Sequence, residues 1–539
     1  MTQHDAGTAG AAVERSMPDG EWRPKVNPWL ITVVVSMAAF MELLDTDIAN
    51  VALPHIAGTL GASNSESTWV LTSYLVANAI VLPINGWLVQ VFGRKRYFLL
   101  STLLFTVSSF FCGIAPSLPI LLLARILQGI GGGGLQPMVQ AILADTFPPA
   151  RRGLAFGLFG VTCVVAPILG PTLGGWITDN YSWRWIFLMN LPVGALALGL
   201  TARLLEDPPS ARARTQPTRF DSIGFSLLVL GVGALQILLD KGQDDDWFSS
   251  RFITTLAVVT VVSLVALAVY EWSHRDPIID LHLFTNVNFL SANVMMLILG
   301  IVFFSSLVMV PQFLQNLMGY SAFNAGLALS ASGLLALIEM PLIGQLTSRV
   351  QARHLIALGW LGVALSMMLS AQWLDLQISF QTATRMRLVQ ALGLPLLFVP
   401  ITLAAYVGLP PEKNNSAAGL INFTRNIGSS IGTSLVTTLI ARGAQFHQGH
   451  LVSRLASDNP AFQAQADGLA RQLVSAGMGA HQALQQAYAR LYNMVHGQAQ
   501  TLAYIDIFWL LGLCAAVMVG FSFLLKKNDP RAGGQVVVH

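Results

Sequence analysis

Long hydrophobic runs separated by short polar segments make up most of the chain after residue 28. A helix that crosses a bilayer needs about 20 consecutive apolar residues. Runs of about that length are typical of an all-α polytopic membrane protein, and here they predict fourteen spans. These spans lie at 29–53, 68–90, 97–116, 118–142, 153–177, 185–204, 221–240, 252–272, 288–315, 323–348, 354–374, 384–407, 414–441 and 502–525.

The polar segments predict how the chain is oriented. If residues 1–28 and 526–539 are cytoplasmic tails and 205–220 is a cytoplasmic linker, that side carries about 19 Lys and Arg, against about 5 in short outer loops. This bias places both termini in the cytoplasm. Residues 442–501 then form a Gln- and Ala-rich extracytoplasmic insert of one or two amphipathic helices. The insert is either a surface cap or a docking site for a partner.

The chain also repeats itself. The segment "RILQGIG", starting at Arg125, resembles "RLVQALG", starting at Arg387, 262 positions later. The same offset pairs "FPPARRGLAFGL" with "LPPEKNNSAAGL". The repeat predicts two six-helix bundles, 29–204 and 288–525, with the two helices of 221–272 inserted between them. Two such bundles around a central cleft are the architecture of a rocking transporter.

Composition excludes several classes of protein. Only 11% of the residues are charged and mean hydropathy is +0.60, whereas a soluble domain carries about 25% charged residues. The net charge of +3 has no concentrated basic patch, so we expect no nucleic-acid partner. The three cysteines lie in apolar runs, without metal-ligand spacing or a disulfide framework. We predict no metal, no cofactor and no catalytic residue.

The energy source must be an ion gradient. No lysine is followed by Ser or Thr, so the chain lacks the GxxxxGK[ST] phosphate loop that direct use of ATP would need. A membrane enzyme would require a nucleophile or metal cluster in a loop, and the short loops are nearly empty of such groups. These observations favour a secondary transporter over an enzyme.

Three carboxylates interrupt the first hydrophobic run, in "MELLDTDIAN" at 41–50. Asp45 is expected about 13 Å below the outer boundary, and Arg125 of the fourth run about 12 Å below it. An unpaired charge at a helix centre costs about 2.5–3.5 kcal/mol. We therefore predict that Asp45 and Arg125 pair across the N-terminal bundle.

A paired carboxylate at this depth is a candidate proton carrier. Desolvation favours its neutral form, and the neighbouring arginine favours the anion. Our hypothesis is that Asp45 takes up a proton outside and releases it inside, with Arg125 adjusting its affinity. The alternative is a static ion pair that fixes helix packing. Glu42 shares the helix face of Asp45 and would relay the proton or tune the proton affinity of Asp45. Asp47 lies about 160° away and either bonds a neighbouring helix or packs as a neutral acid.

Other intramembrane residues are candidates for the substrate cleft. Glu339 either attracts cationic drugs or caps the kink at Pro341. Arg425 either contacts an anionic substrate or pairs with a carboxylate. Arg387 lies about 5 Å from its predicted helix start, so we expect it to extend toward the membrane surface. The remaining cleft candidates are Asn422, Phe303, Phe304 and Gln315.

Four stretches carry a family resemblance: "LLDTDIANVALPHIAG", "GWLVQVFGRKR", "RILQGIGGG" and "APILGPTLGG". The chain resembles the major facilitator superfamily and, more narrowly, the fourteen-helix drug:proton antiporters that are EmrB-like. The resemblance implies the major facilitator fold and export of hydrophobic or amphipathic drugs from the inner membrane, with H⁺ as the coupling ion. It also implies a periplasmic adaptor and an outer-membrane channel as partners. A dedicated exporter of one metabolite or siderophore-like compound on the same fold is the alternative.

The same motifs imply residues for gating and packing. Gly86, Gly93 and Arg94 belong to the loop 2–3 motif, and Gly170, Pro171, Gly174 and Gly175 belong to the fifth-helix motif. Two positions depart from the family pattern. Gln90 replaces the usual aspartate of the loop 2–3 motif, which puts a charge-based gate at that position in doubt. Asp47 stands where the family usually has threonine.

Overall fold

The computed structural model describes residues 24–207, 220–274, 276–453 and 459–526. Over these residues the chain is helical, without strands. The N-terminal part contains α1(Pro28–Leu60), α2(Asn64–Ser67), α3(Trp69–Phe92), α4(Arg94–Ile114), α5(Leu118–Gly132), α6(Leu135–Thr146), α7(Pro149–Asn180), α8(Trp185–Leu188) and α9(Asn190–Leu204). Next come α10(Ser222–Lys241) and α11(Arg251–Ser273). The C-terminal part contains α12(Val287–Asn316), α13(Ala322–Leu346), α14(Ala352–Trp373), α15(Phe380–Ala405), α16(Asn414–Ser453), α17(Pro460–Ser475) and α18(Ala480–Phe521).

Thirteen helices of the described part are long and apolar enough to cross a membrane, so the chain is a multi-pass membrane protein. The predicted span 118–142 is made by α5 and α6 in succession, and 185–204 by α8 and α9. The predicted span 414–441 lies within α16, which is not among the thirteen because it is rich in Asn, Ser and Thr. The count of fourteen spans and the cytoplasmic position of the termini therefore stay predictions.

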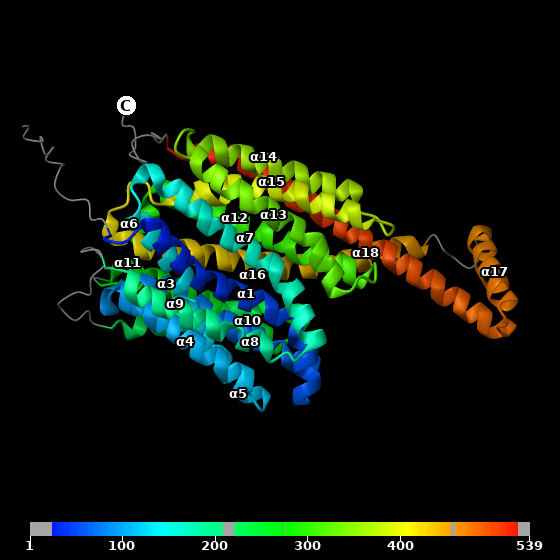
Figure 1. Cartoon of the computed structure of the whole chain (residues 1–539). Coiled ribbons are helices and arrows are strands. Elements are labelled where there is room, and N and C mark those ends of the chain that lie inside the picture. Colours follow the sequence, from blue (N-terminus) through cyan, green and yellow to red (C-terminus); the bar gives the residue numbers. More distant parts are fainter. Residues whose placement is uncertain (1–23, 208–219, 275, 454–458, 527–539) are drawn as a thin grey trace, which may run out of the picture.

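The helices form two bundles that pack along their lengths. We call α1–α9 the N-bundle and α12–α18 the C-bundle. The N-bundle contacts the C-bundle through α7 against α13 and through α3 against α16. Helices α10 and α11 pair with each other, and α10 packs on α3 and α16 at the side of the two bundles (Figure 1). The arrangement is that of two bundles with an inserted helix pair.

Polar contacts hold the bundles together at the end where α9 leaves and α10 begins, here called the linker end. Asn414 at the start of α16 donates to Asp145 of α6 at 2.6 Å, and Asn422 donates to Gln140 at 2.8 Å. Asn85 of α3 donates to the carbonyl oxygen of Asn415 at 3.3 Å. These contacts close the space between the bundles at this end.

The opposite end carries a helical projection. The last part of α16, α17 and the first part of α18 extend beyond the bundles, with α17 far from the rest of the molecule (Figure 1). The helices α16 and α18 stay together at its base, where His447 lies 2.6 Å from Asp506. We call residues 442–501 the projecting segment. Nearly all of the predicted tails and most of the linker 205–220 lie outside the described residues.

Helix α1 positions the first candidate site. Asn27 caps its start by accepting a hydrogen bond from the Trp29 amide, and Pro28 suits the first turn because it needs no amide partner there. Gly61 ends the helix with a φ of +65°, a left-handed conformation that glycine adopts without steric cost. The 33-residue helix places Glu42, Asp45 and Asp47 near its middle.

Candidate functional site

Asp45 and Arg125 lie at the centre of a fully buried polar cluster in the N-bundle. Nη1 of Arg125 donates to Oδ2 of Asp45 at 2.6 Å, and both side chains are 0% exposed. The other carboxylate oxygen accepts from Gln128 of α5 at 3.0 Å and from Asn190 of α9 at 2.7 Å. The pairing expected from helix depth is present. Two amides also stabilise the carboxylate, so Arg125 is not its only partner.

Arg125 is fixed by contacts of its own. Its Nε donates to the carbonyl oxygen of Val70 at 3.0 Å. Its guanidinium lies 4.2 Å from the ring centroid of Tyr74 and 5.5 Å from that of Phe187. Cation–π contacts of this kind strengthen when the cation is away from water. The arginine is therefore held in place even when its ion-pair partner loses its charge.

Glu42 lies one turn away and has a separate set of partners. Its Oε1 accepts from Tyr74 and from Asn78, each at 3.1 Å, and its Oε2 accepts from Gln136 of α6 at 2.6 Å. Gln136 in turn accepts a hydrogen bond from Arg425 of α16. A chain of three side chains thus connects a carboxylate of the N-bundle to a cation of the C-bundle.

Asp47 faces another direction, as helical phase predicts. It packs against α7, where a methyl group added to Gly170 would lie 2.8 Å from the Asp47 Cβ. Among the described residues, Asp47 has no hydrogen bond or ion pair, although the side chain is only partly exposed. The expectation that it bonds a neighbouring helix is therefore not met in this conformation.

The C-bundle contains a similar cluster around Arg387, and here the prediction is wrong. Arg387 does not extend to the membrane surface but is 2% exposed inside the bundle. Its Nη1 donates to Gln390 at 2.6 Å and to Ser306 at 3.3 Å. Helix α15 begins at Phe380 rather than at 384, so Arg387 lies about 10 Å along it instead of 5 Å.

Of the other cleft candidates, Phe303 lines a small hollow together with Arg387. Phe303 and Phe304 of α12 are half-buried and in contact with each other, with ring centroids 5.3 Å apart. Gln315 is half-buried near the end of the same helix. Glu339 of α13 is half-buried, and its Oε2 is buried without a hydrogen-bond partner. Asn422 joins Gln140 of the N-bundle rather than an open cleft.

The loop 2–3 motif forms part of the contact at the linker end. Gly93 joins α3 to α4 with a φ of +78°, which favours glycine. Arg94, the next residue, is buried and pairs with Asp145 of α6. A methyl group added to Gly86 would overlap Ser416 of the C-bundle. The charge pair of this region is thus made by Asp145, not by the half-buried Gln90.

The fifth-helix motif lets α7 cross α1 closely. Gly170 faces Asp47, and a methyl group on Gly174 would lie 2.7 Å from Cγ1 of Ile48. Pro171 lies inside α7 without ending it, and Gly175 is buried. Small residues at such crossings permit close backbone approach within a membrane.

Sequence reasoning missed the polar residues that complete the clusters. They are Tyr74, Asn78, Gln128, Gln136, Asp145 and Asn190. Gln128 lies within "RILQGIGGG", one of the stretches that carry the family resemblance, and this was a usable signal. Asn190 lies in the apolar run 185–204, outside the four stretches. Tyr74, Asn78 and Gln136 are neutral, so the cost of burial does not single them out, and Asp145 lies just outside the predicted span 118–142.

Comparison with known proteins agrees with the fold and the motifs. The family model of the Major Facilitator Superfamily matches residues 35–433. "Multidrug export protein EmrB" of Escherichia coli (strain K12) is 37% identical over 505 residues, covering 94% of this chain and 96% of the relative. EmrB of Haemophilus influenzae is 39% identical over 506 residues, with the same coverage.

Two other matches have lower sequence identity and different printed functions. The "Fatty acid resistance protein FarB" of Neisseria gonorrhoeae is 34% identical, covering 94% of this chain and 97% of the relative. The crystal structure of the human organic anion transporter MFSD10 matches with a TM-score of 0.55 at 14% identity, covering 91% of this chain and all of that one. This chain therefore belongs to the major facilitator superfamily, within the group of EmrB-like multidrug exporters of the inner membrane.

Proposed function

We propose that this protein exports hydrophobic or amphipathic drugs from the cell and draws the energy from protons that move inward. The observation that carries the proposal is the buried Asp45–Arg125 pair, which places one titratable carboxylate at the centre of the N-bundle. Relatives at 37–39% identity that are named multidrug export proteins support the substrate class.

Protonation of Asp45 would alter the cluster in a defined way. The neutral acid loses its attraction to Arg125, while Gln128 and Asn190 remain within hydrogen-bond distance of it. Arg125 stays between Tyr74 and Phe187, so the change is local and reversible. The two protonation states then favour different packing of α1 against α5 and α9. This packing is the two-state element that alternating access needs.

The chain Glu42–Gln136–Arg425 supports a coupling between the carboxylates and closure of the bundles. Gln136 binds Glu42 through its amide nitrogen and Arg425 through its carbonyl oxygen. Loss of the negative charge on Glu42 weakens its charge-assisted hydrogen bond with Gln136. The Gln136 side chain is then held less firmly in the orientation in which its carbonyl oxygen accepts from Arg425. Protonation would therefore loosen one polar contact between the two bundles.

The projecting segment supports a proposal about partners. It carries α17 away from the two bundles on the side opposite the linker end (Figure 1). A periplasmic adaptor that leads to an outer-membrane channel would meet this surface first. We propose that the segment contacts such an adaptor, whereas drug and proton move through the two bundles.

Drug uptake into everted membrane vesicles tests the transport proposal. An imposed pH gradient should drive uptake of a fluorescent cationic drug by the wild type, and an uncoupler should abolish it. Asp45→Asn should reduce gradient-driven uptake by about 100-fold or more, because the variant cannot carry the proton. Asp179→Asn is the matched control, since this carboxylate is exposed at the end of α7 and should be without effect.

Equal insertion of both variants is checked by the amount of protein in the membrane. Undiminished uptake by Asp45→Asn, still sensitive to the uncoupler, would show that another group carries the proton.

A further inference from the structure

The two bundles contain the same buried network, related by the internal repeat. In the N-bundle, Arg125 donates to Gln128 at 2.8 Å, and Gln128 donates to Ser109 at 3.2 Å. In the C-bundle, Arg387 donates to Gln390 at 2.6 Å, and Gln390 donates to Ser370 at 2.8 Å. The corresponding residues are 261 or 262 positions apart, which matches the offset of the sequence repeat.

The networks differ at one position. Nη1 of Arg125 donates to the carboxylate of Asp45, and Nη1 of Arg387 donates instead to the hydroxyl of Ser306, 261 positions after Asp45. Among the described residues no carboxylate lies within ion-pair distance of Arg387. The C-bundle thus has the buried cation without a carboxylate counterion among the described residues.

Arg387 is poorly compensated as a result. It is 2% exposed, and its Nε is buried without any acceptor. A cation inside a membrane bundle is costly unless it meets an opposite charge or a set of acceptors. Ser306 and Gln390 offer two neutral acceptors, so the site still favours a negative charge.

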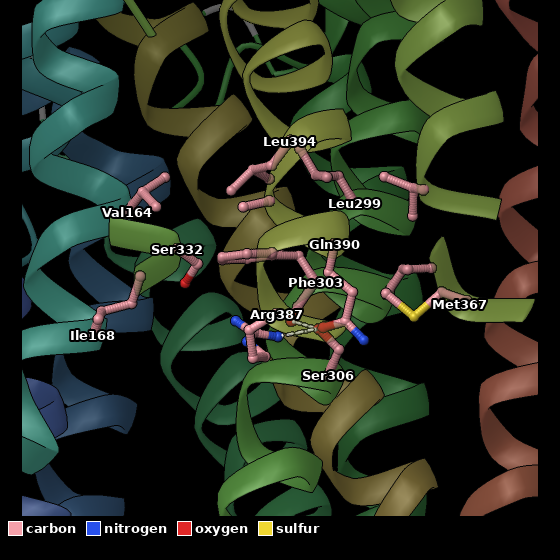
Figure 2. Close-up of a pocket in the computed structure, with 13 residues that line it drawn as sticks. Val164, Ile168, Leu299, Phe303, Ser306, Ser332, Met367, Arg387, Gln390 and Leu394 are labelled. Carbon is pink, nitrogen blue, oxygen red and sulfur yellow. Dashed lines mark hydrogen bonds between the residues drawn. The ribbon is translucent and has the colours of Figure 1, made fainter. Parts of the chain in front are cut away.

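A small hollow lies beside this cation. Figure 2 shows Arg387 together with Ser306 and Gln390 at one end of the hollow, and Ser332 with apolar side chains around the rest. Its volume is about 20 Å³, room for about one water-sized group. Val164 and Ile168 of α7 form part of the wall, so the hollow borders the interface between the bundles.

We propose that Arg387, Gln390 and Ser306 form a binding site for one monovalent anionic group. The group is either the carboxylate of an amphipathic substrate, whose apolar tail lies toward the bundle interface, or a free chloride ion. The assignment of the group to a substrate carboxylate rests on the proposed export function, whereas anion binding itself does not. In either case the ligand takes the place that Asp45 occupies in the N-bundle.

Thermal unfolding of the full-length protein in lipid nanodiscs tests the site without a proton gradient. The probes are decanoate, its methyl ester, and chloride titrated against gluconate, a polyhydroxylated anion that has no apolar tail to lie along the bundle interface. Decanoate should raise the melting temperature of the wild type in a saturable manner, and the uncharged ester should not. If chloride also raises the melting temperature and competes with decanoate, the site takes a free anion as well as a substrate carboxylate.

Ser306→Asp is the decisive variant, because it restores to the C-bundle the carboxylate that the N-bundle has. It should raise the half-saturating anion concentration by about tenfold or more, since the internal carboxylate occupies the site. Arg385→Gln, which removes an exposed cation from the same helix, is the matched control and should still bind. Arg387→Gln provides a second loss-of-binding variant if Ser306→Asp fails to fold.

The outcomes separate this inference from the transport proposal. An anion effect that is equal in the wild type, Ser306→Asp and Arg387→Gln, or absent from the wild type, overturns the site. Neither result bears on gradient-driven uptake through Asp45. Conversely, loss of proton coupling with intact anion binding would overturn the transport proposal alone.

Discussion

Asp145 binds two partners at once: Arg94 of its own bundle and Asn414 of the other. Arg94 is 2% exposed, so its charge depends on Asp145 for compensation. Removing one member of a buried ion pair leaves the other uncompensated, which typically costs about 3–5 kcal/mol. The stability of the linker end should therefore depend strongly on this one carboxylate.

Asp145→Ala tests that dependence. We expect the free energy of unfolding to fall by about 3–5 kcal/mol, measured as a lower melting temperature of the purified protein. Asp179→Ala serves as the control, because Asp179 is exposed and its ion-pair contact, with His55, is 4.0 Å long. An unchanged melting temperature for Asp145→Ala would mean that Arg94 finds another partner or is hydrated.

Some of these residues were predictable from the sequence and others were not. Asp45 and Arg125 lie near the middle of long helices, where an error of a few residues in the boundary hardly changes the depth. Arg387 lies near a helix start, where the same error moved it from the interior to the surface in the prediction. The amides of Gln128 and Asn190 carry no charge, so the cost of burial does not single them out.

At the scale of helices, the crossing of α1 and α7 depends on Gly170. A methyl group at this position would lie 2.8 Å from the Asp47 Cβ and 3.2 Å from the backbone of α1. Neither contact is with the end of a flexible side chain, so one helix must shift to accommodate it. Overpacking of this kind typically costs about 1–3 kcal/mol.

We therefore expect Gly170→Ala to lower the melting temperature and to slow drug uptake into vesicles. Gly58→Ala is the matched control, because this glycine is also helical, in α1, and a methyl group there meets nothing within 4 Å. Gly58→Ala should be neutral, or stabilising by up to about 1 kcal/mol. Equal stability of the two variants would contradict the close crossing.

Helix positions were easier to predict than helix ends. Apolar runs identify where a helix crosses the bilayer, because burial in lipid is what selects them. They do not show where α16 and α18 end outside it, since Ala, Gln and Leu continue a helix equally well in water. As a result, the predicted span 414–441 is only part of the 40-residue α16, and 502–525 begins well inside the 42-residue α18, which ends at Phe521.

At the scale of the whole molecule, the sequence repeat predicted the two bundles, and the projecting segment is the part of the C-bundle that departs from the repeat. The segment has no counterpart in the N-bundle, where the corresponding α7 ends at Asn180. Its separate helix, α17, packs on α18. Transport by the bundles should therefore survive without it.

Replacing residues 450–495 by a short Gly/Ser linker tests this division of roles. We expect gradient-driven uptake into vesicles to remain within about twofold of the wild type, because neither buried cluster is touched. Drug resistance of intact cells that have two membranes should be lost, because the adaptor contact is removed. Intact resistance would count against docking at this segment.

The central claim is that Asp45 carries the proton that the substrate exchanges. It is tested most directly by adding a drug to the purified, full-length protein in a weakly buffered solution and measuring the protons released. The wild type should release protons in proportion to bound drug, and Asp45→Asn should bind the drug and release none. Proton release by Asp45→Asn equal to that of the wild type would contradict the account.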